Sequence, residues 1–245
     1  MEYLHLVALG GAAALGAAIN AVAGGGTFLV FPLLILNGLG AVAANIMATI
    51  ALWPGSVASS VAFKSQRAHL DMKRLIPLIV MSVAGSALGT WLLLSTPEAL
   101  FAGLVPYLLL GATLIFTFGR SLTIRSTGSK TAPLLQFPIA IYGGYFGAGI
   151  GILMLAMLQI LGMRQIHEMN AVKTVLGSTI NAVAFLVFVF SPLVVWDVAL
   201  AMMIGAIIGG YAGARLSLHV SPQKVRLAIS TLGFAMSGYF FLYGV

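Results

Sequence analysis

The sequence predicts an all-α integral membrane protein made of two inverted-topology repeats, each a glycine-broken helical hairpin followed by three transmembrane helices. Three observations lead to this prediction. Of the 245 residues, 60% are hydrophobic and only 7% are charged, whereas soluble proteins carry about a quarter charged residues. The apolar residues form continuous runs of about 20 residues, which is the length a helix needs to cross a bilayer. Glycine clusters and polar residues recur at one spacing in both halves of the chain.

The first half, residues 1–118, is expected to form the first repeat. Its hairpin consists of residues 4–23 and the short apolar piece 27–36, which are separated by Gly24, Gly25 and Gly26. Three longer apolar segments follow, at residues 41–63, 75–94 and 99–118. Helices are expected in all of them, because a segment surrounded by lipid must satisfy its own backbone hydrogen bonds.

The second half has the same plan after a polar linker, residues 119–133, which is expected to be cytoplasmic. Its hairpin consists of residues 134–146 and 152–161, with a break from Gly147 to Gly151. Three more apolar segments follow, at residues 169–190, 195–214 and 225–243. Residues 134–245 are therefore taken as the second, inverted repeat of a single membrane domain.

A shift of about 125 residues aligns the two halves. It places Gly24 on Gly149 and Gly26 on Gly151, and it also pairs polar and aromatic residues of the segments that follow, namely Asn45 with Asn170, Thr49 with Thr174 and Phe63 with Phe188. The identities are few, but they keep one order and one spacing. This regularity indicates an internal repeat.

The positions of the basic residues predict the orientation, because Lys and Arg gather in cytoplasmic loops. The loops around Glu98 and Asp197 have neither and should face outside. If each broken hairpin returns to the side it entered, each repeat crosses the membrane an odd number of times and the two are inverted, as in secondary transporters. The basic residues that define the cytoplasmic side are Lys64, Arg67, Lys73, Arg74, Arg120, Arg125, Lys130, Arg164, Arg215, Lys224 and Arg226.

The two glycine breaks are the first candidate binding elements. Short helices that start near Thr27 and Ile152 would direct their N-termini to the middle of the membrane, and helix N-termini offer N–H donors and partial positive charge to an anion. Tight helix packing is the alternative explanation for the glycines, but the matched positions favour a substrate site. The substrate-binding residues expected here are Gly24, Gly25, Gly26, Thr27, Gly147, Gly149 and Gly151.

Polar residues of the following segments are the second set of candidates. Asn45 and Thr49 are four residues apart and share one helix face, as do Asn170 and Thr174. These faces could bind an oxyanion, or they could join helices to one another. Asn20, Ser56 and Asn181 are weaker candidates of the same kind.

Lys173 stands apart because an ionisable residue within a membrane segment points to function. It would attract an anion. Alternatively, it reaches the inner surface or pairs with Glu168.

Several classes of function lack their usual residues. The chain has no cysteine, no HExxH, no GxSxG and no phosphate-binding loop, so we expect neither an enzyme nor a metal or other cofactor. The basic residues lie between apolar runs and not on one soluble face, which argues against nucleic-acid binding. The spaced glycines Gly85, Gly89, Gly205, Gly209 and Gly213 predict close helix packing.

Three stretches resemble the TauE/SafE family of sulfite exporters, also called the toluene-sulfonate uptake permease family. The first stretch is residues 21–28 with 31–34, AVAGGGTF and FPLL, which looks like the glycine-rich opening of that family. The second is residues 143–151, GGYFGAGIG, and the third is residues 205–222, with GARL at 213–216. The resemblance covers nearly the whole chain, and it implies transport of sulfite, organosulfonates or related small anions across the bacterial inner membrane.

The sequence therefore predicts a secondary transporter that moves a small anion by alternating access. An anion channel or passive uniporter, a carrier of a different small organic anion, and a membrane scaffold without transport activity are the alternatives. The expected partners are the anionic substrate and the lipid bilayer. The substrate, the direction, the coupling ion and the oligomeric state stay open, and a homodimer is one state that the sequence allows.

Overall fold

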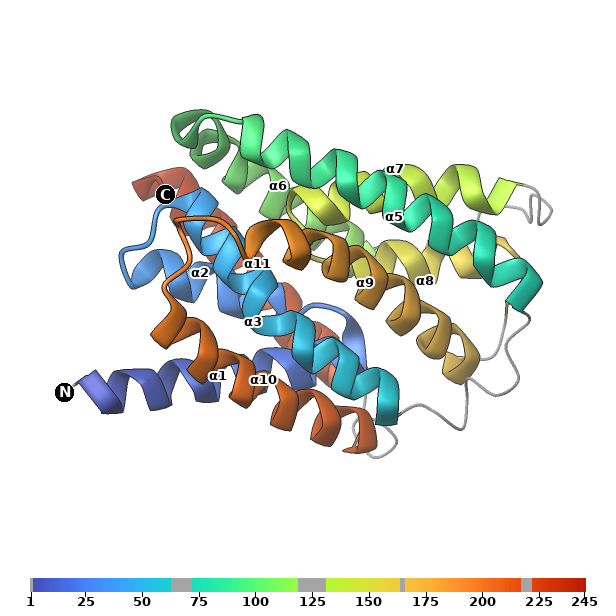
Figure 1. Cartoon of the computed structure of the whole chain (residues 1–245), viewed down its shortest axis with the longest axis horizontal. Coiled ribbons are helices and arrows are strands. Elements are labelled where there is room, and N and C mark those ends of the chain that lie inside the picture. The colour runs from blue at the N-terminus through green and yellow to red at the C-terminus, as the bar shows by residue number, and fades with distance from the viewer. Residues whose placement is uncertain (1, 63–71, 119–130, 164–165, 217–221) are drawn as a thin grey trace.

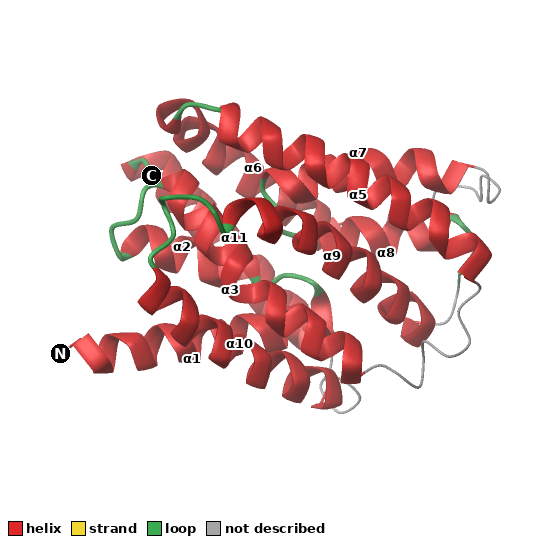
Figure 2. Ribbon diagram, in the orientation of Figure 1, coloured by secondary structure: helices red, strands yellow, loops and turns green. Residues whose placement is uncertain are grey.

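The computed structural model describes residues 2–62, 72–118, 131–163, 166–216 and 222–245. Over these ranges every regular element is an α-helix (Figure 2). This confirms the all-α prediction and agrees with the need of a lipid-embedded backbone to pair its own polar groups.

The helices of the first half match the predicted segments closely. They are α1 (Glu2–Ala23), α2 (Thr27–Leu36), α3 (Ala41–Ala62), α5 (Met72–Ser95) and α6 (Glu98–Phe118). The helices of the second half are α7 (Ala132–Tyr145), α8 (Ile150–Ile160), α9 (Ile166–Phe188), α10 (Trp196–Leu216) and α11 (Pro222–Tyr243). In the described part of the chain, 6 helices are long and apolar enough to cross a membrane, namely α1, α3, α5, α6, α9 and α10.

Several helix ends differ from the predicted ones by one to three residues, among them the starts of both helices of the second hairpin. Helix α7 begins at Ala132, within the expected linker 119–133, of which residues 119–130 lie outside the described ranges. Helix α8 begins at Ile150, two residues earlier than expected, because Gly149 adopts a left-handed conformation and ends the break there.

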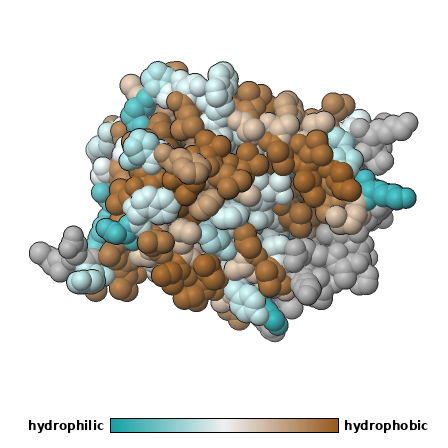
Figure 3. Space-filling view, viewed as in Figure 1, coloured by the Kyte–Doolittle hydropathy of each residue, from teal (hydrophilic) through white to brown (hydrophobic). Residues whose placement is uncertain are grey.

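The surface of the bundle is suited to lipid. Large apolar side chains such as Trp91, Leu186 and Ile208 are more than 60% exposed, and apolar residues cover much of the face drawn in Figure 3. A soluble monomer rarely exposes contiguous apolar area on this scale. Helix α3, in contrast, is mostly enclosed by the other helices: 67% of its membrane-spanning stretch is buried, against at most 44% for the other candidate spans. It forms the centre of the bundle.

The two broken hairpins enter the bundle from opposite ends (Figure 1). Helix α1 runs inward from the end marked N, and α2 returns towards that end. Helix α7 starts at the other end, and α8 runs back to it. The two tips meet inside: a methyl group placed on Gly24 would lie 3.0 Å from the Cα atom of Gly151.

Small residues fix each hairpin against a long helix of the other half. Helix α5 packs on α7, and α10 packs on α1. A methyl group on Gly85 would lie 2.6 Å from the carbonyl oxygen of Phe137 in α7, and one on Gly205 or Gly209 would collide with the backbone of α1. The predicted close packing of these glycines is thus confirmed.

Candidate functional site

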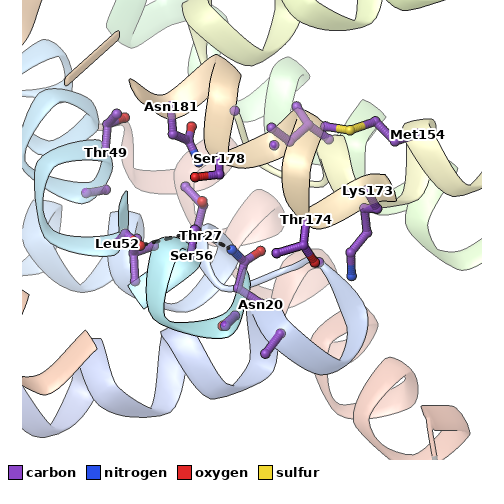
Figure 4. Close-up of a pocket in the computed structure, with 18 of the residues that line it drawn as sticks. Asn20, Thr27, Thr49, Leu52, Ser56, Met154, Lys173, Thr174, Ser178 and Asn181 are labelled. Carbon is purple, nitrogen blue, oxygen red and sulfur yellow. Dashed lines mark hydrogen bonds between the residues drawn. The ribbon is translucent and has the colours of Figure 1, made fainter. Parts of the chain in front are cut away.

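A polar cavity lies where the two hairpin tips meet α3 and α9 (Figure 4). Its volume of about 50 Å³ exceeds several times the roughly 10–15 Å³ that one water molecule needs on the same measure. The lining residues are Asn20, Ala21, Gly24, Thr27, Ala48, Thr49, Leu52, Ser56, Ser59, Phe146, Gly147, Ile150, Gly151, Met154, Lys173, Thr174, Gly177, Ser178 and Asn181.

Glycine is required at the tips by two kinds of geometry. Gly24, Gly147 and Gly149 have φ values of +80°, +78° and +75°, a left-handed conformation that costs other residues about 1–2 kcal/mol. Gly151 must be glycine for a different reason: the other tip is so close that a methyl group on Gly151 would lie 2.9 Å from the Cα atom of Gly24. Side chains on Gly24 or Gly151 would push the two tips apart.

Lys173 places a cation beside the tips. The residue is 4% exposed, and its Nζ atom is buried without a hydrogen-bond partner in the described part of the chain. A methyl group on Gly151 would lie 3.3 Å from its Cδ atom, and Figure 4 shows the amine directed into the cavity near Thr174. An isolated buried charge is costly unless something compensates it, so this amine is a candidate anion ligand.

Spacing along the helix explains why Lys173 is not paired with Glu168, as the sequence allowed. The two residues are five positions apart in α9, whereas side chains on one helix meet when they are three or four positions apart. The other alternative was that the side chain of Lys173 extends to the membrane surface. It does not, because it is buried beside the second hairpin tip.

Hydroxyl and amide groups supply neutral hydrogen-bonding atoms. Thr49 and Thr174 donate to the carbonyl oxygens of Asn45 and Asn170 at 3.0 and 2.7 Å. Asn20 donates to the hydroxyl of Ser56 at 3.3 Å, a bond that ties the end of α1 to α3. Hydroxyl groups can rotate towards a new acceptor, so these side chains can turn to an anion without moving their helices.

Five of the predicted site residues do not line the cavity: Gly25, Gly26, Asn45, Gly149 and Asn170. Asn45 donates its side-chain N–H to the carbonyl oxygen of Tyr145 at 2.9 Å, which ties α3 to the end of α7. A methyl group on Gly26 would lie 2.9 Å from the Cβ atom of Asn20. One on Gly149 would lie 3.3 Å from the ring of Phe28. Gly26, Asn45 and Gly149 therefore shape the tips around the cavity.

The amide oxygens of Asn45 and Asn170 have no hydrogen-bond partner among the described residues. Both oxygens are buried, and neither residue lines the cavity.

The structure adds residues that the sequence reasoning missed. On α3 they are Ala48, Leu52 and Ser59, and on α9 they are Gly177 and Ser178. They share one helix face with the expected candidates, which are Thr49 and Ser56 on α3 and Lys173, Thr174 and Asn181 on α9. Extending the helical period from Thr49 and Thr174 would have found most of them. Phe146 and Met154 carry no such signal, because apolar residues in an apolar chain do not stand out.

Comparisons with known proteins agree with these features. The profile of the family described as "Sulfite exporter TauE/SafE" matches residues 9–240. The chain is 28% identical to a probable membrane transporter protein of Haemophilus influenzae over 229 residues, which cover 89% of this chain and 88% of that one. It is 27% identical to the probable membrane transporter protein ORF9 of Sinorhizobium sp., with coverage of 95% and 91%. The probable membrane transporter protein YfcA of Escherichia coli K12 is 26% identical, with coverage of 89% and 83%. No solved structure matches the chain.

Proposed function

The chain belongs to the TauE/SafE sulfite exporter family of multi-pass membrane transporters, and from this premise we propose that it is a secondary transporter of a small anion. Sulfite or an organosulfonate is the proposed substrate, moved across the bacterial inner membrane by alternating access. The observation that carries the proposal is the amine of Lys173, which lies in a polar cavity between the two hairpin tips and has no hydrogen-bond partner among the described residues.

Inverted repeats are part of the proposal, and the helix contacts support them. If α1, α2, α3, α5 and α6 correspond to α7, α8, α9, α10 and α11, the pairing of α1 with α10 recurs as α7 with α5. The pairing of α3 with α10 likewise recurs as α9 with α5, and that of α2 with α11 as α8 with α6. Trp53 donates to the carbonyl oxygen of Ser178 at 3.2 Å, and these residues are 125 positions apart. Equivalent positions touch in this way when they lie near a pseudo-twofold axis.

The cavity also follows the repeat. Five pairs of its lining residues are related by the same shift, namely Ala21 with Phe146, Ala48 with Lys173, Thr49 with Thr174, Leu52 with Gly177, and Ser56 with Asn181. A substrate site at the interface between repeats can open to either side when one repeat rocks against the other. This location favours alternating access rather than a channel with a fixed pathway.

Recognition of the anion follows from the cavity's side chains. Lys173 supplies the charge, and a charge-assisted hydrogen bond is about twice as strong as a neutral one. The hydroxyls of Thr49, Thr174 and Ser56 can turn towards the oxygens of the anion. A different small organic anion would satisfy the same groups, so the experiment must compare substrates.

The first test is a thermal-shift measurement on the purified protein in detergent with sulfite, thiosulfate, small sulfonates and small carboxylates. A ligand at about 100 times its Kd stabilises the folded state by about 2.7 kcal/mol. We expect at least one sulfur oxyanion to raise the Tm. Lys173→Met should weaken its apparent affinity at least about 30-fold, because truncating one partner of a buried charged pair costs at least about 2 kcal/mol.

Arg215→Met is the matched control. It removes an exposed cation whose guanidinium donates to Tyr211 at 2.9 Å and which does not line the cavity. Its anion response should equal that of the unmodified protein. No response to any anion, or an equal loss in both variants, would contradict an anion site at Lys173.

A further inference from the structure

The cavity contains a single formal charge. Among its described lining residues, Lys173 is the one ionisable side chain, and all the others are neutral. The repeat does not double this charge, since the position equivalent to Lys173 is Ala48, which also lines the cavity. The positive charge therefore comes from the second half of the chain alone.

Three carboxylates have described side chains, namely Glu98, Glu168 and Asp197, and none of them is a lining residue of the cavity. Both carboxylate oxygens of Glu98 accept from the backbone N–H of Val42, at 3.3 and 3.2 Å, and so cap the start of α3. Asp197 is exposed in the first turn of α10. Glu168 lies in the first turn of α9 and off the face of Lys173. Among the described lining residues, an anion bound in the cavity would therefore meet one cation and no carboxylate.

Helix termini change this balance little. Each hairpin tip brings the carboxyl end of one helix, α1 or α7, next to the amino end of the next, α2 or α8. The partial charges at these ends are about half a unit and opposite in sign. They largely offset each other within a tip, although the N–H groups can still donate hydrogen bonds.

We propose, on the basis of the transport function above, that the cavity selects singly charged anions over doubly charged anions of the same shape, and that Lys173 sets this preference. A monoanion and the ammonium group of Lys173 form a neutral pair. A dianion leaves one negative charge uncompensated in a buried site, where an unpaired ion is strongly disfavoured. Within the proposed substrates this selects a sulfonate or the hydrogensulfite ion over the doubly charged sulfite ion.

The test compares methanesulfonate with sulfate, two tetrahedral sulfur oxyanions of similar size with one and two charges. Apparent dissociation constants are measured by thermal shift on the full chain in detergent, at pH 7 and constant ionic strength. We expect methanesulfonate to bind at least about tenfold more tightly than sulfate, since an uncompensated buried charge costs more than the roughly 1.4 kcal/mol that a factor of ten requires.

Methanesulfonate differs from sulfate both in charge and in its methyl group, and Ala48→Lys separates these two effects. It adds a second cation at the equivalent position of the cavity, and it should move the ratio of the two constants at least about tenfold towards sulfate. Ala48→Met adds similar bulk without charge and should leave the ratio unchanged. The measurement on the unmodified protein stands by itself if Ala48→Lys does not fold.

The outcomes distinguish this inference from the proposed function. Sulfate binding as tightly as methanesulfonate, with both lost in Lys173→Met, would overturn the charge preference and leave the anion site intact. Binding of neither anion, together with silence towards the other sulfur oxyanions, would overturn both. If the tenfold preference for methanesulfonate over sulfate persists unchanged in Ala48→Lys, the methyl group of methanesulfonate determines it and the charge does not, which would overturn the inference.

Discussion

At the scale of single residues, Thr49 and Thr174 contribute paired hydroxyl groups to the cavity. Each donates to the carbonyl oxygen four residues earlier in its helix. Each hydroxyl therefore has a hydrogen-bond acceptor within its own helix when no anion is bound. It can rotate away from that carbonyl oxygen and donate to an anion instead. This arrangement lets the site exist in the apolar interior both with and without substrate.

Replacing these hydroxyls should weaken anion binding without disturbing the fold. Thr49→Val and Thr174→Val keep the shape of the side chain and remove one donor each. We expect the apparent affinity to fall roughly 10–100-fold in each variant, the value of a hydrogen bond of about 1.5–3 kcal/mol to a charged group. Thermal shift with the best-binding anion measures the change.

Thr231→Val provides the comparison. Thr231 makes the same local bond, to the carbonyl oxygen of Leu227 at 3.0 Å, but on an exposed face of α11. Its replacement should not alter anion affinity. If all three variants bind equally well, the threonines of the cavity do not contact the substrate.

Lys173 shows how far the sequence alone could go. Its position inside an apolar segment indicated function, but two alternatives remained, a pair with Glu168 and extension to the surface. Only the packing of α9 against the second hairpin decides that the side chain is buried beside Gly151. Contacts between residues far apart in the chain are not encoded in local spacing. For the same reason the bond from Asn45 to Tyr145 could not be foreseen.

At the scale of elements, the contact between the two hairpin tips determines the geometry of the cavity. The Cα atoms of Gly24 and Gly151 leave no room for a methyl group on either side. Helices α2 and α8 have 10 and 11 residues, too few to cross a bilayer, which takes about 20. Each hairpin therefore depends on the other tip and on the surrounding helices for the burial of its end.

Substitutions at this contact should destabilise the protein. We expect Gly24→Ala and Gly151→Ala to lower the free energy of unfolding by about 1–3 kcal/mol, the usual cost of overpacking. Gly24→Ala should be the more harmful because its φ of +80° adds strain. Thermal unfolding in detergent, without added anion, measures both.

Gly103→Ala is the matched control, since a methyl group on Gly103 in α6 would meet no atom within 4 Å. It should leave the Tm unchanged or raise it slightly, because alanine is the better helix former. Equal Tm values for Gly24→Ala, Gly151→Ala and Gly103→Ala would mean that the tips do not touch as described.

The order of the elements was more predictable than their ends. Continuous apolar runs and glycine breaks predicted the helices, and α2 was placed at residues 27–36, as observed, because glycines precede it and a polar turn follows it. The start of α8 was missed by two residues, because the sequence GAGIG does not reveal that Gly147 and Gly149 are left-handed while Gly151 is already helical. The cavity follows from how the helices pack, and it was predicted only where residues lay near the tips or on one face of α3 or α9.

At the scale of the whole molecule, the apolar exterior and the polar cavity have separate roles. The exterior is suited to lipid, and small-residue contacts hold each hairpin against a long helix from the other half of the chain. The cavity is formed by both halves together. Because the close pairs α1–α10 and α5–α7 each join the two halves, a rocking motion that changes access to Lys173 would keep each pair together and move one pair against the other.

Counterflow in proteoliposomes tests the proposed carrier most directly. Vesicles preloaded with a high concentration of unlabelled substrate anion receive a trace of the labelled anion outside. We predict transient accumulation of label above equilibrium, saturating with concentration, and its loss in Lys173→Met but not in Arg215→Met. Label that only equilibrates, at a rate proportional to concentration, would indicate a channel, and counterflow undiminished in Lys173→Met would contradict a substrate site at this lysine.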